Sequence, residues 1–453
     1  MQVTEAVANG LKRELQVVIP KGDLDQRFSA RIDNLKDTMQ IKGFRKGKVP
    51  ATHIKKVYGR SIMAEVLQET LNESSQKAIT DRNERPAFQP KIDLTEDKEE
   101  IEKLFSGQSD LAFKMSFEVL PQIALTDFST LKLERDVVEV SDEDVDKGVK
   151  ELAERGTKFE VEADRTASDG DQVTIDFVGK INGEAFEGGT GTDMPVVLGR
   201  GGFIPGFEDG LKGAKSGDQR KIEATFPEAY PEKKLAGQKA EFDSVVKSVA
   251  KAIVPAVDDE FAKSLGLEDV TRLKDVIKAQ ISGQYEQLSR NKLKRQLLDQ
   301  LDKAHTFELP ETLVTNEFDG IWKQITDGLE KSGKTFESEG KTEASAREEY
   351  RKIAERRVRL GLVIGEVGDK NKIQVTQDEL RRSLMEQVRR FPGQEQMVYD
   401  FYDKNPGALT ELRAPIFEDK VVDHIVALAK PIDRTVTKDD LLKSAAADDN
   451  ETA

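Results

Sequence analysis

A run of basic residues near the amino terminus is the part of the sequence best suited to binding phosphate groups. Residues 38–64 contain no Asp or Glu, although the chain carries 85 acidic residues and a net charge of −15. The cations of this segment are Lys42, Arg45, Lys46, Lys48, Lys55, Lys56 and Arg60. Charge alone is explained more simply by a solvated basic turn between two helices, and Lys55 and Lys56 are expected to be ordinary surface residues.

The centre of this segment, GFRKGKVP at residues 43–50, has the composition of an exposed turn. Its two glycines permit a tight bend, and Pro50 suits the first turn of a following helix. Such a turn presents Phe44 beside Arg45 and Lys46. The cations can then neutralise phosphates while the aromatic ring fills an apolar pocket.

Composition excludes several other chemistries. The chain has no cysteine, which rules out disulfides, thiol catalysis and thiolate zinc sites. The histidines His53, His305 and His424 are isolated in the sequence, so we expect neither a metal nor a cofactor. Because the net charge repels nucleic acid at long range, DNA is not an expected partner, and any RNA contact requires a local basic patch.

The amino-terminal residues MQVTEAVANGLKREL lack the apolar stretch of a secretory signal. No apolar run approaches the ~18 residues that a membrane span needs. The sequence therefore predicts a cytoplasmic protein that has no membrane partner, and the lack of cysteine fits a reducing compartment.

The glycine content divides the chain into regions of different character. Thirteen of the 33 glycines fall between Gly170 and Gly217, a density that favours turns between short strands over long helices. Alternating apolar residues occur at 173–177 and again at 222–226. Residues 156–250 therefore predict a compact, antiparallel β-rich domain.

The region before this domain predicts a small α+β domain at residues 1–118. Helical spacing of apolar residues covers 23–36 and 51–84, and apolar residues alternate over 111–119 as in a strand with one buried face. Residues 119–155 predict a connector that ends in a short helix.

The region after the β-rich domain is predicted to be helical. Apolar residues keep helical spacing through much of 251–432, and Thr376 with Glu379 forms a capping box that opens one of the helices. Residues 433–453 end in SAAADDNETA, which is polar and acidic, so this tail is expected to be mostly disordered.

The motif GFRKGKVP resembles the ribosome-binding signature of trigger factors, which are ribosome-docked chaperones. The resemblance implies that the chain binds the large ribosomal subunit, on a protein and ribosomal RNA beside the exit tunnel. It also implies that residues 1–118 form the ribosome-binding domain. The docking residues carried over by position are Gly43, Phe44, Arg45, Lys46, Gly47, Lys48 and Pro50.

The β-rich region resembles FKBP-type prolyl isomerases in the order and spacing of VTIDFVG, GEAFEGG, FIPGFEDGLKG, FPEAYP and AEFDSVV. The resemblance implies a peptidyl-prolyl cis-trans isomerase with a short helix beside its sheet. Many FKBPs have Trp at the position of Phe207. Trigger factors share the Phe of this chain, and the absence of Trp puts tight binding of macrolide inhibitors in doubt. The implied pocket residues are Phe177, Phe186, Ile204, Phe207, Tyr230 and Phe242.

Prolyl isomerisation requires neither a nucleophile nor a metal. The X-Pro barrier of about 18–20 kcal/mol arises from amide resonance. A dry aromatic pocket can hold the proline ring and favour the twisted amide. Tyr230 can supply a hydroxyl to a substrate carbonyl, and family analogy makes the backbone N–H of Ile204 a second donor. Asp176 and Glu187 are expected to flank the pocket without acid–base roles.

The carboxy-terminal segments RRVRLGLVIGEVGDKNKI and FYDKNPGAL also resemble trigger factors. The resemblance implies a multidomain α+β protein whose all-α carboxy-terminal domain is elongated and bears arms. It further implies that the connector packs with this domain and that the arms hold nascent and unfolded polypeptides. It also implies that the chain can form a homodimer off the ribosome. A closed helical bundle would show the same periodicity.

Two other functions compete with a ribosome-associated chaperone that isomerises X-Pro bonds. One is a free-standing FKBP-type isomerase whose helical arms serve dimerisation or holding of clients. The other is an acidic helical adaptor whose β-rich domain is catalytically inactive.

Overall fold

The computed structural model describes residues 1–38, 44, 49–95, 97–228, 230, 232 and 234–451, without the side chains of 339, 406 and 447–451. The chain forms two compact units, which are described separately. One contains Met1–Arg135 and Asn291–Asp433, and the other contains Asp136–Arg290 and the residues from Arg434 onward. Among the described residues, no helix combines the length and the apolar character that crossing a membrane requires.

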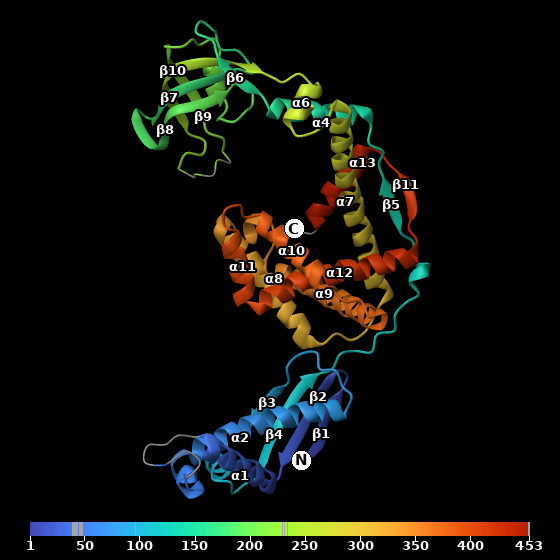
Figure 1. Ribbon diagram of the computed structural model, residues 1–453. Helices are drawn as coiled ribbons and strands as arrows, with labels where there is room; N and C mark the ends of the chain where they lie inside the picture. Colours follow the sequence, from blue (N-terminus) through green and yellow to red (C-terminus); the bar gives the residue numbers. More distant parts are fainter. Residues whose placement is uncertain are drawn as a thin grey trace. The chain divides into compact units, whose positions relative to one another are not determined.

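The amino-terminal part of the first unit is a sheet covered by helices (Figure 1). The strands lie in the order β1-β2-β4-β3 and pair antiparallel. Apolar side chains that alternate along β2 and β4 face the helices, as where Val17 pairs with Phe113. The elements are β1 (Gln2–Asn9), β2 (Lys12–Ile19), α1 (Lys21–Thr38), α2 (Ala51–Asp81), β3 (Lys91–Leu94), α3 (Lys98–Phe105) and β4 (Leu111–Glu118).

From Asn291 onward the first unit is largely helical, as predicted. Ile123, Phe128 and Leu133 of the connector belong to the same buried cluster as side chains of the helices. The backbone N–H of Thr126 also donates to Nε2 of the buried His305 at 3.3 Å. The elements are α7 (Val270–Ala304), which the two units share, α8 (Glu311–Ser332), α9 (Glu343–Asn371), α10 (Gln377–Arg389), α11 (Glu395–Lys404) and α12 (Pro406–Ala429).

The predicted capping box at the start of α10 is present. The hydroxyl of Thr376 accepts a hydrogen bond from the backbone N–H of Glu379, and the Glu379 carboxylate accepts one from the backbone N–H of Thr376. The same carboxylate pairs with Lys420 of α12 at 2.7 Å. The hydrogen bonds from Lys420 and then Thr376 lower the pKa of Glu379 to about 2, so the carboxylate that joins α10 to α12 is ionised at neutral pH.

The second unit contains the predicted antiparallel β domain (Figure 1). Its sheet has the order β6-β10-β7-β8, with β9 paired to β10. Val173 and Ile175 on β7 and Val246 and Val249 on β10 are fully buried. The elements are β6 (Lys158–Val161), β7 (Gln172–Ile181), β8 (Glu184–Val197), α5 (Phe207–Leu211), β9 (Gln219–Thr225) and β10 (Lys239–Ile253).

A short helical segment adjoins this domain in the second unit. It contains α4 (Asp142–Arg155), α6 (Asp259–Ser264) and the first part of α7. Val145 and Val149 of α4 share a buried cluster with Phe261 and Leu273. Ser141 caps α4 by accepting the backbone N–H of Asp144.

The tail is more ordered than its composition suggested. Strand β11 (Ile432–Thr435) pairs with β5 (Glu134–Val137), and α13 (Lys438–Glu451) follows where the sequence predicted a mostly disordered tail. Leu441 is only 1% exposed, and Lys438 pairs with Asp144 of α4 at 2.6 Å. One buried leucine and one ion pair fix the helix, and neither produces a periodic pattern in so short a segment.

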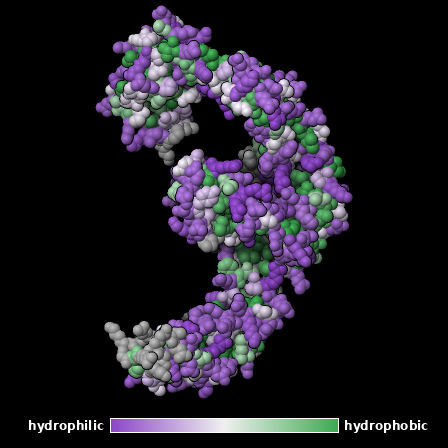
Figure 2. All heavy atoms as spheres, viewed as in Figure 1, coloured by the Kyte–Doolittle hydropathy of each residue, from purple (hydrophilic) through white to green (hydrophobic). Residues whose placement is uncertain are grey.

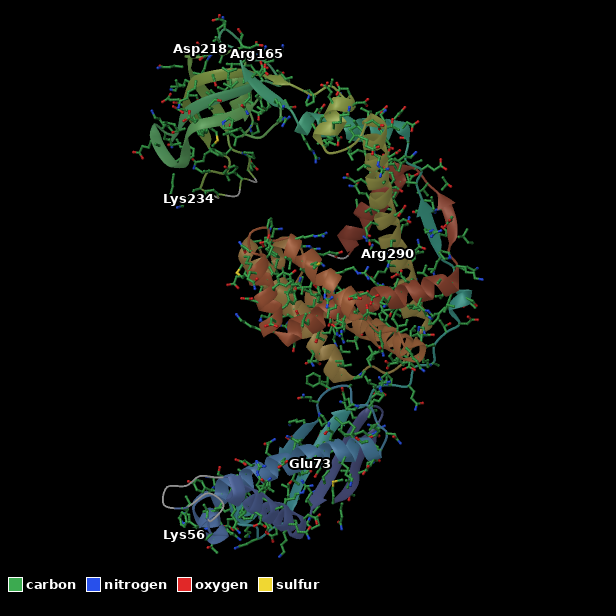
Figure 3. All side chains as sticks on the ribbon, viewed as in Figure 1. Lys56, Glu73, Arg165, Asp218, Lys234 and Arg290 are labelled. Atoms are coloured by element: carbon green, nitrogen blue, oxygen red, sulfur yellow. The ribbon has the colours of Figure 1, made fainter. Side chains whose placement is uncertain are left out.

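An ion pair fixes the loop that enters the β domain. Arg165, labelled in Figure 3, donates through Nε and Nη2 to the Asp171 carboxylate at 2.9 Å each, and Ser168 adds its N–H and its hydroxyl. Asp171 is 2% exposed. Burial raises its pKa, but the hydrogen bonds from Arg165 and Ser168 outweigh burial, and the net pKa is lowered.

Replacing Asp171 with Asn should therefore destabilise the β domain by about 1–3 kcal/mol at pH 7, because a charge-assisted hydrogen-bond network is broken. A lowered carboxylate pKa stabilises the fold above the unfolded pKa of about 3.9 and loses this effect as pH falls below it. The difference between variant and wild type should thus shrink below about pH 4.

Hydrogen exchange of β7 and β10 amides measures this difference, and Asp218→Asn, at a side chain that is 40% exposed, is the matched control. If Asp171→Asn were as stable as Asp218→Asn at pH 7, the stabilising role given to the Asp171 network would be contradicted.

Candidate functional site

Phenylalanine rings from four elements of the β domain meet in one cluster. Phe177 of β7, Phe207 of α5 and Phe242 of β10 form a triangle, with ring centroids 5.0–6.0 Å apart in edge-to-face geometry. Phe186 of β8 joins through Phe242 at 6.2 Å. Edge-to-face pairs at these distances contribute about 0.5–1.5 kcal/mol each beyond burial, so the cluster is a rigid apolar surface.

Burial divides the predicted pocket residues into a floor and a rim. Phe207 is 1% exposed, and Phe177 and Phe242 are also buried. Phe186, Ile204 and Tyr230 are half-buried and pack against the same core. The structure thus brings all six predicted residues together, with three forming the buried floor and three reaching the surface.

Two further aromatic residues, which the sequence analysis did not single out, pack against these rings. The ring of Phe203 stacks on Phe207 at 5.0 Å. Phe226 contacts Phe186 at 5.9 Å and Tyr230 at 4.8 Å. Phe226 is fully buried and supports the rim. The available signal was their place in the chain, since each lies within four residues of a predicted pocket residue.

Bare backbone at glycines makes room for the rings. A Cβ added at Gly191 would lie 2.6 Å from the Phe177 ring, and one at Gly179 would lie 2.7 Å from Phe242 and 2.8 Å from Phe186. Ordinary Cβ contacts are well beyond these distances. Glycines on β7 and β8 therefore set how deeply the rings sit on the sheet.

The carboxylate of Asp176 is engaged in other contacts. It accepts the backbone N–H of Asp193 at 2.8 Å and pairs with Lys247 at 2.9 Å. These contacts, the backbone hydrogen bond first, lower the pKa of Asp176. An ionised, paired carboxylate is a poor proton donor near neutral pH, in keeping with a reaction that needs no acid–base group.

Tyr230 lies in the loop between β9 and β10. Figure 3 labels Lys234 of the same loop. The backbone N–H of Tyr230 donates to the carbonyl of Pro227 at 3.1 Å, and the Tyr230 ring contacts Phe226. These contacts keep the tyrosine at the edge of the ring cluster.

The second candidate site is the basic tip of the amino-terminal domain. Phe44 is 37% exposed, and its ring lies 5.1 Å from that of His53. Val49 is buried in the domain core, and Pro50 is the N-cap residue of α2. The other predicted docking residues lie outside the described part of the chain; they are Gly43, Arg45, Lys46, Gly47 and Lys48.

The basic residues on α2 are exposed, as predicted for Lys55 and Lys56. Figure 3 labels Lys56 near the amino-terminal end of this helix. The ammonium group of Lys55 lies 5.5 Å from the ring of Phe28, and Arg60 pairs with Glu102 at 2.7 Å. The first turn of α2 contains no acidic residue, so the positive character of the segment persists here.

Models of known families match most of the chain. The model of the bacterial trigger factor amino-terminal region matches residues 1–152, and that of the trigger factor carboxy terminus matches residues 269–427. The model of FKBP-type peptidyl-prolyl cis-trans isomerases matches residues 163–248. The FKBP match contains all the residues of the aromatic cluster.

Whole-chain relatives agree with these matches. The trigger factor of Chelativorans sp. (strain BNC1) is 48% identical over 98% of this chain and 93% of its own length. That of Brucella abortus (strain S19) is 49% identical over 97% of this chain and 93% of its own length. A solved structure described for promiscuous substrate recognition by the trigger factor chaperone covers 94% of this chain and 99% of its own, with a TM-score of 0.54 at 20% identity.

Replacing Gly191 with Ala should destabilise the β domain by about 1–3 kcal/mol, because the added methyl group overpacks against Phe177. The change in the free energy of unfolding is measured by urea unfolding, with hydrogen exchange of the β7 amides as the probe of the β domain. Gly202→Ala is the control, since a Cβ there meets nothing within 4 Å. Equal stability of both variants would show that the ring does not rest on this glycine.

Proposed function

Because the chain belongs to the trigger factor family, it is a ribosome-associated chaperone with an FKBP-type prolyl isomerase domain, and we propose which residues carry each activity. The observation that carries the isomerase assignment is the aromatic cluster, with a buried floor at Phe207 and a half-buried rim at Phe186, Ile204 and Tyr230.

We propose that the proline ring of a client rests on Phe207, between Phe177 and Phe242. A floor of packed rings excludes water. The twisted amide, which has lost its resonance, binds there better than the planar ground state does. The Tyr230 hydroxyl and the Ile204 backbone N–H donate to carbonyl oxygens of the client. The barrier falls because contacts strengthen as the amide twists.

We propose that the tip around Phe44 docks on a protein and ribosomal RNA beside the exit tunnel of the large ribosomal subunit. Support comes from the exposed Phe44 ring and from the four cations at residues 42–48 of the sequence, in a molecule of net charge −15. An acidic molecule approaches RNA productively only through a local patch of opposite sign.

We propose that the helical arms hold nascent and unfolded segments through exposed apolar side chains. Met385, Phe391, Met397 and Phe401 of the α10–α11 region are each 47–59% exposed. Flexible methionine and aromatic side chains adapt to clients of different shape. Figure 2 shows hydrophobic residues scattered among hydrophilic ones over the visible face, a surface suited to weak, promiscuous binding.

We propose a division of labour along the boundaries expected from the sequence. Residues 1–118 would dock, 119–155 connect, 156–250 isomerise and 251–432 hold clients, with cytoplasmic location and homodimer formation off the ribosome. A free-standing isomerase with dimerisation arms is not favoured, because trigger factor models match on both sides of the isomerase region.

Tyr230→Phe should slow isomerisation of an X-Pro peptide by roughly 2- to 10-fold, the value of one hydrogen bond worth about 0.5–1.5 kcal/mol. The ring and its contact with Phe226 remain in place. NMR exchange between cis and trans peptide measures the rate, with Tyr350→Phe on α9 as control. An unchanged rate would remove the hydroxyl from the mechanism.

Reversing charge at Arg45 and Lys46 together should abolish co-sedimentation with 50S subunits, and Phe44→Ala should weaken it. Wild-type binding should weaken as salt rises. The logarithm of the binding constant should fall with the logarithm of the salt concentration by roughly 0.7–0.9 for each phosphate neutralised. The control reverses Lys55 and Lys56, which we expect to be surface residues. Binding that survives reversal at the tip would support the free-standing isomerase.

A further inference from the structure

The loop that leads into the isomerase site is held by one carboxylate. Oε2 of Glu208 accepts the backbone N–H of Gly199 at 2.8 Å and that of Gly201 at 3.2 Å, and Oε1 accepts that of Phe203 at 3.3 Å. Alternate N–H groups of residues 199–203 thus converge on a single side chain. Three backbone N–H groups that converge on one carboxylate form an anion nest.

This loop has little else in its sequence to fix its shape. It reads GRGGF, and Gly199 and Gly201 adopt positive φ angles of 83° and 67°. Glycine loses more conformational freedom on ordering than any other residue, so a glycine-rich loop stays variable unless its backbone is bonded. Outside the nest, Arg200 donates to the carbonyl of Glu154 at 3.2 Å.

The carboxylate and the floor of the site are neighbours in sequence. Gly206, at φ 91°, turns the chain into α5, whose first residues are Phe207 and Glu208. Phe207 forms the buried floor, and Phe203, the last residue of the nest, stacks on it at 5.0 Å. Ile204 follows Phe203 directly, so any movement of the nest displaces the backbone N–H of Ile204.

We propose that Glu208 is a positioning residue for prolyl isomerisation, which fixes residues 199–203 so that the Ile204 N–H stands ready for the twisted client amide. This inference rests on the proposed isomerase function. Glu208 does not touch the client; it acts by removing the need to order a glycine-rich loop during the reaction. The ring floor binds the ground state without it.

The test compares Glu208→Ala, Glu208→Gln and the control Asp209→Asn in the full chain, using the same X-Pro peptide. Glu208→Ala should lower kcat about tenfold or more, the effect of losing one well-placed donor, while peptide affinity changes less than about threefold. Glu208→Gln keeps one acceptor oxygen and should recover part of the rate. Asp209 pairs with Lys212, and its variant should match wild type.

A second readout does not depend on activity. Amide exchange at Gly199, Gly201 and Phe203 should accelerate in Glu208→Ala and stay slow in Asp209→Asn. If the wild type were inactive while its loop amides stayed protected, the isomerase assignment would be refuted. The positioning role would then be refuted as well, although the nest would remain as a structural element. A normal kcat in Glu208→Ala, or a parallel loss of kcat, affinity and thermal stability, would overturn the positioning role directly.

Discussion

Contact between Phe207 and its neighbouring rings joins the core of the β domain to its reactive surface. The rings of Phe177 and Phe242 meet Phe207 edge to face and rest on bare backbone at Gly191 and Gly179. The residues that stabilise the domain therefore also form the floor on which a proline ring is proposed to rest. Because interiors are close-packed, the floor cannot shift without disturbing the sheet.

Charge has a different role in the amino-terminal domain. Acidic residues outnumber basic ones by 85 to 70 over the chain, yet residues 38–64 contain seven Lys or Arg and no Asp or Glu. Phe44 belongs to this segment and is exposed. In the docking proposed for it, electrostatic attraction brings the segment to a polyanion, and the ring adds contact that salt does not screen. The proposed docking and isomerase sites thus rest on opposite physical principles.

Sequence patterns predicted most of the elements that position these sites. Alternation along β4 and β7 and the Thr376–Glu379 capping box are visible because burial or a local hydrogen bond dictates residue type at fixed spacing. Strand β1 was missed because all of its side chains are exposed and no alternation results. Helix α13 was missed because it depends on Leu441 and on an ion pair distant in sequence. The stacking of Phe203 on Phe207 and the Glu208 nest were also not predicted, since neither contact leaves a periodic pattern in the sequence.

Everything proposed for the β domain requires that the proline ring of a client rest on its aromatic floor. Intermolecular nuclear Overhauser effects between the full chain and an X-Pro peptide can detect this contact. We expect contacts from proline ring protons to Phe207, Phe186 and Tyr230, in the same sample in which cis–trans exchange is accelerated. Accelerated exchange with the proline ring in contact only with other surfaces would contradict it.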